Sequence, residues 1–212
     1  MDNTLNKKVG ILGGTFNPIH IGHLILAENA CEYCGLDEVL IMPSGCSYLK
    51  NQNDIASKED RINMVKLSIE GNERFKLSTI ETEREGNSYT ADTLKELLLN
   101  NPDTTYYYII GTDILFSMET WKDPRVIFDS AIIVVAPRDF KSIEEIECQI
   151  KYLEDKYNAR IILLNTANLD ISSNDIRSLI SKGYSCKYYL NDRVIDYINA
   201  HKLYQKESGY ER

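Results

Sequence analysis

Two imidazoles and two glycines lie within one short stretch that could bind a phosphate group. The sequence GGTFNPIHIGH covers residues 13–23. His20 and His23 are three residues apart, so on a helix both rings face the same side. Gly13 and Gly14 carry no Cβ, which lets a ligand approach the backbone. The alternative is that the two histidines are ordinary polar surface residues.

The elements around this stretch must hold it in place. Residues 9–12 are an apolar run that predicts a strand, and apolar residues from Leu24 to Cys31 recur at helical spacing. The order is therefore strand, tight loop and helix, with Asn17-Pro18 at the corner. We expect the helix start to offer unpaired N–H groups and a positive dipole end, which suit a phosphate.

A second group of candidate ligands lies near the other end of the chain. The sequence ISSNDIR covers residues 171–177, and Ser172 or Ser173 is a good N-cap for the helix that follows. Arg177 lies in the first helical turn, where a cation opposes the dipole unless an anion also binds there. Hydroxyls, free amides and a guanidinium together predict a polyphosphate site.

Four further residues have a functional and a structural interpretation each. Thr90 could cap a helix or hold a small anion beside its neighbours' amides. Asp113, just past an apolar strand, could bind a ribose hydroxyl or cap the next helix. Trp121 could stack on a flat ring or pack at the edge of the core. Lys50 could bind a ligand from its loop or be a solvated lysine.

Apolar segments alternate with helical patterns along the whole chain. This alternation predicts a Rossmann-like α/β fold, a doubly wound parallel sheet in one domain over residues 1–212. We expect residues 165–204 to form a small C-terminal helical part that carries the ISSNDIR motif, and residues 81–86 to be exposed. The expected strands are 9–12, 38–42, 75–80, 105–110, 131–136 and 160–164.

Composition narrows the class of protein. The 212 residues carry a formal net charge of −8, which argues against non-specific binding to nucleic acid or to an acidic membrane. Neither a membrane span nor a signal-peptide core is apparent, so we expect a cytoplasmic protein. The five cysteines include a CxxC at Cys31 and Cys34, at the far end of the first predicted helix. We interpret both as packing residues, with redox or zinc chemistry as the alternative.

Taken together, GGTFNPIHIGH and ISSNDIR resemble the signatures of the HxGH nucleotidyltransferase superfamily. Within it, the chain resembles the nicotinate-nucleotide adenylyltransferases through residues 88–94, 111–113, 137–138 and Trp121. The resemblance implies that the chain joins ATP to nicotinate mononucleotide in NAD biosynthesis. The products would be nicotinate adenine dinucleotide (deamido-NAD) and pyrophosphate, formed by direct in-line displacement.

The resemblance also implies a role for each residue that matches the motifs. Catalytic roles fall to His20, His23, Lys50 and Arg177. The ATP ligands would be Gly13, Gly14, Thr15, His20, His23, Gly111, Asp113, Ile171, Ser172, Ser173 and Arg177. The ligands of nicotinate mononucleotide would be Phe16, Asn17, Ser44, Lys50, Tyr89, Thr90, Trp121 and Arg138. Leu49 stands where many members carry a histidine, so Lys50 is a weaker match.

Mg²⁺ is the implied cofactor, held mainly through the phosphates of ATP and without a dedicated set of protein ligands. The alternatives are phosphopantetheine or nicotinamide mononucleotide as acceptor, a fragment of a class I aminoacyl-tRNA synthetase, and a non-catalytic nucleotide-binding protein. The sequence leaves the oligomeric state open, a homo-oligomer included.

Overall fold

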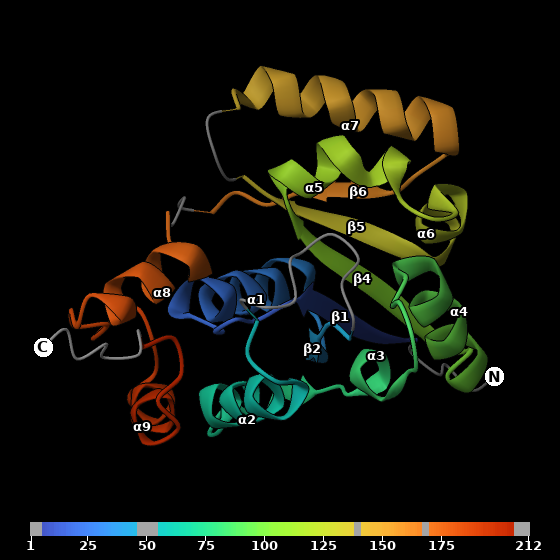
Figure 1. The fold of residues 1–212 in the computed structure, drawn as a ribbon. Coiled ribbons are helices and arrows are strands. Elements are labelled where there is room, and N and C mark those ends of the chain that lie inside the picture. The colour runs from blue at the N-terminus through green and yellow to red at the C-terminus, as the bar shows by residue number, and fades with distance from the viewer. Residues whose placement is uncertain (1–5, 46–54, 138–140, 167–169, 206–212) are drawn as a thin grey trace, which may run out of the picture.

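One parallel sheet organises the computed structural model, which describes residues 6–45, 55–137, 141–166 and 170–205 (Figure 1). Its strand order is β3-β2-β1-β4-β5-β6, and all described pairings are parallel. The predicted doubly wound α/β fold is thereby confirmed. The strands are β1 (Lys7–Gly14), β2 (Glu38–Pro43), β3 (Phe75–Leu77), β4 (Thr104–Gly111), β5 (Ala131–Ala136) and β6 (Ile161–Leu163).

Helices cover both faces of the sheet, and each face has its own apolar core. Alternation along a strand divides the side chains: Val134 of β5 lies in one core and Ile133 in the other. The first core is covered by α1 (Ile21–Cys34), α2 (Lys58–Ile69), α8 (Ser173–Ser181) and α9 (Asp192–Ala200). The second is covered by α4 (Thr90–Asn100), α5 (Thr112–Ser117), α6 (Pro124–Ser130) and α7 (Ile143–Tyr157).

The strand order reverses between β1 and β4, which lie side by side at the centre of the sheet. Leu12 of β1 pairs with Ile109 of β4, so the loops that follow both strands emerge together. Open α/β sheets bind ligands in the crevice at such a switch point. The glycines at the end of β1 and Gly111 at the end of β4 therefore border the same crevice.

Local sequence chemistry sets several helix starts as expected. The side chain of Ser57 accepts a hydrogen bond from the amide of Asp60 at the start of α2. Ser172 does the same for Asp175 at α8, and Asn191 for Arg193 at α9. Each cap satisfies an amide that the helix itself leaves unpaired.

Other expectations need correction. Thr90 is the first residue of α4 rather than its cap, which is Tyr89. The strand expected to reach Ile80 ends at Leu77, and Ile80–Glu83 forms the short helix α3. Within the segment expected to be exposed, Thr82 is buried and Glu81 is half-buried. The Ser88 hydroxyl donates to the backbone oxygen of Glu81 over 3.1 Å, which ties the start of this segment to the residues that follow it.

The CxxC at the end of α1 packs into the protein. Cys31 is 1% exposed and its thiol lies 3.3 Å from the backbone oxygen of Leu36, while Cys34 packs beside the same core. Burial raises the pKa of both thiols, which disfavours the reactive thiolate. The geometry therefore supports the packing interpretation.

None of the helices in the described part of the chain is long and apolar enough to span a bilayer.

Candidate active site

A cavity of about 700 Å³ opens where β1 and β4 end. It brings together both sequence motifs, although they are far apart in the chain. All eleven residues expected to bind ATP line it: Gly13, Gly14, Thr15, His20, His23, Gly111, Asp113, Ile171, Ser172, Ser173 and Arg177.

The two histidines form a stacked pair at the start of α1. Their ring centroids are 3.6 Å apart and their planes differ by 26°. The backbone N–H of His20 donates to Nδ1 of His23 over 3.2 Å. Because Nδ1 of His23 accepts this bond, the ring proton of neutral His23 lies on Nε2, where it can be donated to an anion. The Phe16 ring meets His23 edge-on, with centroids 5.0 Å apart, and helps to fix its orientation.

The amides at the start of α1 are less available than the sequence indicates. The N–H of His20 is taken by the His23 side chain, and the N–H of Ile21 donates to the backbone oxygen of Tyr189 over 2.9 Å. The expectation of a fully unpaired helix start is therefore wrong for these two amides. Side chains must supply more of the ligand contacts at this point.

Two hydrogen bonds attach the start of α8 to the loop after β1. The Ser173 hydroxyl donates to the backbone oxygen of Pro18, and Nη1 of Arg177 donates to the backbone oxygen of Asn17, each over 2.8 Å. Figure 1 shows α8 beside α1, where this contact forms. The two motifs are thus joined directly to each other.

Asn17 connects this loop to other parts of the chain through several hydrogen bonds. Its side-chain oxygen accepts hydrogen bonds from the Tyr204 hydroxyl at 2.8 Å and from the amide of Ala56 at 3.0 Å. Asn17 is 5% exposed, and Phe16 is buried in the first core. The side-chain oxygen of Asn17 therefore has two bonds within the protein, and its expected contact with nicotinate mononucleotide stays a prediction.

Gly22 belongs to the first motif, and the reason for a glycine at this position appears only in the folded structure. A Cβ at this position would lie 3.1 Å from Nδ1 of His20 and 3.6 Å from the Cβ of Ile171. The missing side chain lets the histidine ring and the second motif close over the start of α1.

Two of the residues expected to bind nicotinate mononucleotide, Thr90 and Trp121, lie beside Tyr108 of β4. The hydroxyls of Tyr108 and Thr90 are 3.4 Å apart, and the rings of Tyr108 and Trp121 meet edge-on with centroids 6.5 Å apart. Burial raises the pKa of Tyr108 to about 12, so its hydroxyl stays protonated at neutral pH. A Cβ on Gly13 would lie 3.5 Å from this hydroxyl, which places the group next to the end of β1.

Trp121 itself is half-buried and packs against the second core. This contact supports the core-edge interpretation, while ring stacking stays a prediction. Tyr89, the cap of α4, lies beneath the ammonium group of Lys122, which is 4.7 Å from the centroid of its ring.

Ser44 lies next to the end of β1, since its amide donates to the backbone oxygen of Gly14 over 2.8 Å, but it is not among the described residues that line the cavity. Lys50 and Arg138 lie outside the described residues.

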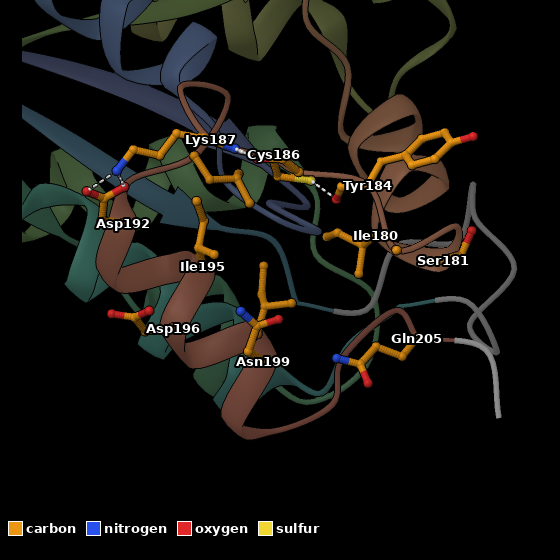
Figure 2. Close-up of a pocket in the computed structure, with 14 residues that line it drawn as sticks. Ile180, Ser181, Tyr184, Cys186, Lys187, Asp192, Ile195, Asp196, Asn199 and Gln205 are labelled. Atoms are coloured by element: carbon orange, nitrogen blue, oxygen red, sulfur yellow. Dashed lines mark hydrogen bonds and ion pairs between the residues drawn. The ribbon is translucent and has the colours of Figure 1, made fainter. Parts of the chain in front are cut away.

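A second hollow, of about 750 Å³, lies between α8 and α9 (Figure 2). Lys187 is ion-paired with Asp192 over 2.7 Å at its edge. None of the residues expected to bind either substrate lines this hollow. The cavity at the strand ends is therefore the candidate active site.

Arg61 was not anticipated from the motifs. It is 2% exposed on the inner face of α2, and its guanidinium reaches the loops after β1 and β2. A signal was present in the sequence: Arg61 shares the helical spacing of the buried residues Met64, Val65 and Ser68. An arginine in register with a buried face predicts an internal cation.

Comparisons with known proteins agree with this geometry. The cytidylyltransferase-like family model matches residues 11–179. A relative from Lachnoclostridium phytofermentans, named "Probable nicotinate-nucleotide adenylyltransferase", is 43% identical over 93% of this chain and 99% of its own. A protein of the same name from Dehalococcoides mccartyi is 38% identical over 96% of this chain and 100% of its own.

A solved structure supports the fold. Nicotinic acid mononucleotide adenylyltransferase from Plasmodium falciparum, complexed with NaAD, superposes with a TM-score of 0.76 at 22% identity, over 93% of this chain and 97% of the other. From the family match and the close relatives, the chain belongs to the nicotinate-nucleotide adenylyltransferases of the cytidylyltransferase-like family.

Proposed function

We propose that the chain transfers the adenylyl group of ATP to nicotinate mononucleotide, with nicotinate adenine dinucleotide and pyrophosphate as products. The observation that carries the proposal is the contact between the motifs. Arg177 and Ser173 of α8 are bonded to the loop that precedes His20, so both motifs face one cavity. Relatives that share 43% and 38% of their residues with this chain bear the name of that activity.

The reaction needs alignment more than acid–base chemistry. A phosphate oxygen of nicotinate mononucleotide attacks the α-phosphorus of ATP, the bond from that phosphorus to the bridging oxygen breaks, and pyrophosphate leaves with the electron pair. The nucleophile is already an anion, so no general base is required. The protein must hold the two phosphates in line and stabilise the growing negative charge.

The described residues suit that task. His23 can donate from Nε2, and Arg177 keeps donor capacity at the mouth of the cavity beside Asn174. His20 stacks on His23 and is 2% exposed, so it can contact only a ligand that enters the cavity. Lys50 completes the proposed catalytic set.

The residues of this site fit a Mg²⁺ ion that arrives bound to the phosphates of ATP. Asp113 is the one carboxylate among the described residues that line the cavity, and the described residues hold no cluster of three candidate metal ligands. Such a donor set suits an ion held by phosphates, water and at most one carboxylate. When bound, Mg²⁺ neutralises phosphate charge.

The acceptor, nicotinate mononucleotide, would bind on one side of Tyr108, and the residues proposed to bind ATP lie on the other. Thr90 and Tyr89 at the start of α4 are proposed to receive the nicotinate carboxylate, and Trp121 the pyridine ring. The N-terminal end of a helix favours a carboxylate over a neutral amide. This arrangement predicts a preference for nicotinate over nicotinamide mononucleotide.

Pyrophosphate release from MgATP tests the proposal, with nicotinate mononucleotide, nicotinamide mononucleotide and phosphopantetheine assayed in parallel. The expected result is rapid release with the first, slower release with the second and none with the third. Release with phosphopantetheine alone would assign a different acceptor. ATP binding without release would indicate a nucleotide-binding protein that is not an enzyme.

A further inference from the structure

Arg61 places a positive charge inside the protein, directly beneath the loops that form the candidate active site. It begins the second turn of α2 and points inward with Met64 and Val65, both of which are fully buried. Its own side chain is 2% exposed. The guanidinium is therefore shielded from bulk water and does not touch a ligand in the cavity itself.

The guanidinium clamps two loops that leave the sheet at neighbouring strands. Nη1 donates to the backbone oxygen of Thr15 and to the backbone oxygen of Ser44, each over 2.8 Å. Thr15 follows β1, and Ser44 follows β2. The amide of Ser44 also donates to the backbone oxygen of Gly14 over 2.8 Å, so the two loops and Arg61 form one bonded unit.

Among the described residues this charge is not ion-paired with a carboxylate, and Glu59 attracts it only from beyond ion-pair distance. The Nε of Arg61 is buried without a hydrogen-bond partner in the part of the chain that the structure describes. Burial lowers the pKa of Arg61, yet a guanidinium remains protonated near neutral pH. A buried charge without a partner is costly, so a compensating anion is expected nearby at some stage of function.

A second arginine is bonded to the same loop. Arg177 donates to the backbone oxygen of Asn17, two residues after the carbonyl that Arg61 holds. Arg177 also lacks an ion pair among the described residues. Two guanidinium groups that form no ion pair among the described residues therefore bind the backbone of residues 15 and 17, in a chain whose formal net charge is −8.

We propose that Arg61 is a positioning residue of the phosphate site and that its buried charge is balanced by the phosphates of the bound substrates. It acts through Thr15 and Ser44, whose loops it holds against each other, and through its field. The inference rests on the proposed function, because that function brings polyphosphate to this cavity.

Three variants separate this role from simple structural support. Arg61→Met removes the charge and both hydrogen bonds while it preserves much of the side-chain volume. Arg61→Lys keeps the charge but cannot span two carbonyls as a guanidinium fork does. Lys66→Met removes the same charge from the exposed last turn of the same helix and is the matched control.

Two measurements are made on each folded variant. The first is the affinity for MgATP without acceptor, by calorimetry, together with the rise in melting temperature that MgATP causes. The second is the pair of constants kcat and KM for both substrates. A merely structural role would lower the melting temperature of the ligand-free protein and leave the affinity for MgATP unchanged.

The expected order of MgATP affinity is wild type, then Arg61→Lys, then Arg61→Met, with Lys66→Met equal to wild type. The loss in Arg61→Met should be roughly tenfold, the scale for a unit charge acting over about 10 Å at an effective dielectric constant of about 20. The value of kcat/KM should fall on the order of 10²-fold, since small displacements of bound groups have effects of that size.

An Arg61→Met protein that folds and binds MgATP as tightly as Lys66→Met would overturn the proposal. If Arg61→Met does not fold, the test depends on Arg61→Lys. An affinity for MgATP and KM values for both substrates equal to those of the wild type would then also overturn the proposal. The measurement of MgATP affinity does not require that the protein catalyses a reaction. A wild type that binds MgATP but makes no dinucleotide would therefore refute the proposed function and leave the role of Arg61 measurable.

Discussion

Arg177 donates a hydrogen bond over 2.8 Å to the backbone oxygen of Asn17, a residue 160 positions earlier in the chain. This bond links the start of α8 to the loop after β1 and brings a cation to the cavity that the histidine pair also lines. The same guanidinium also reaches the side chain of Asn174 over 3.2 Å. One side chain thus joins the two motifs and retains donors for an anion.

Replacing Arg177 should weaken ATP binding as well as turnover. Arg177→Lys keeps the charge but loses the planar fork that holds Asn17 while it faces the cavity. We expect kcat/KM for ATP to fall on the order of 10²-fold, measured by pyrophosphate release. Arg193→Lys on α9, where the arginine is exposed and paired with Glu70, should retain full activity. Equal activities of the two variants would contradict the role given to Arg177.

Loss of either histidine of the stacked pair should lower turnover while the protein stays folded. His20→Ala and His23→Ala each remove an imidazole from the cavity, and the loss of one such electrostatic contact costs on the order of 10²–10³ in rate. The third histidine supplies the control, because His201 is exposed and stacks on Tyr197. His201→Ala should match the wild type in kcat. Near-normal turnover in both cavity variants would refute the assignment.

The hydroxyl of Tyr108 should matter for the acceptor and not for ATP. Tyr108→Phe removes the group that lies 3.4 Å from the Thr90 hydroxyl and keeps the ring that packs on Trp121. One lost hydrogen bond should raise KM for nicotinate mononucleotide roughly threefold to tenfold, with KM for ATP unchanged. Tyr107→Phe is the matched control, because Tyr107 faces the opposite core. If both variants raise the same KM equally, the effect belongs to the strand and not to this hydroxyl.

Tyr108 should also make stability fall at alkaline pH. Burial raises its pKa in the folded protein to about 12, above the ordinary value of 10.0, so between these values the folded state holds a proton that the unfolded state has lost. The contribution is therefore present below about pH 10 and lost as the pH rises towards 12, by on the order of 1–3 kcal/mol of unfolding free energy. Urea unfolding at pH 9 and pH 11 should show a smaller decline for Tyr108→Phe than for the wild type. Parallel declines would contradict this.

Sequence reasoning predicted the sheet and the cavity well because both depend on local patterns. Apolar runs defined the six strands, and Ser57, Ser172 and Asn191 marked helix starts through their side-chain chemistry. The signature residues around His20 and Arg177 then lined one cavity.

Features that depend on tertiary contact were predicted less well. The turn of helix at Ile80–Glu83 carries a bond from Ser88 to the backbone oxygen of Glu81, a contact that no local pattern reveals. The amide of Ile21 is taken by Tyr189, a residue from the opposite end of the chain. In the sequence, Tyr108 is one of three consecutive tyrosines in β4, and only its contacts with Thr90 and Trp121 in the structure distinguish it.

The late position of α8 has a consequence for synthesis of the protein. All six strands have been made by residue 163, whereas Ser172, Ser173 and Arg177 come afterwards. A growing chain therefore contains all six strands of the sheet before it contains four of the eleven residues proposed to bind ATP. We therefore expect a chain that terminates after β6 to lack the ATP contacts proposed for α8, together with the cover that α8 and α9 give to the first core.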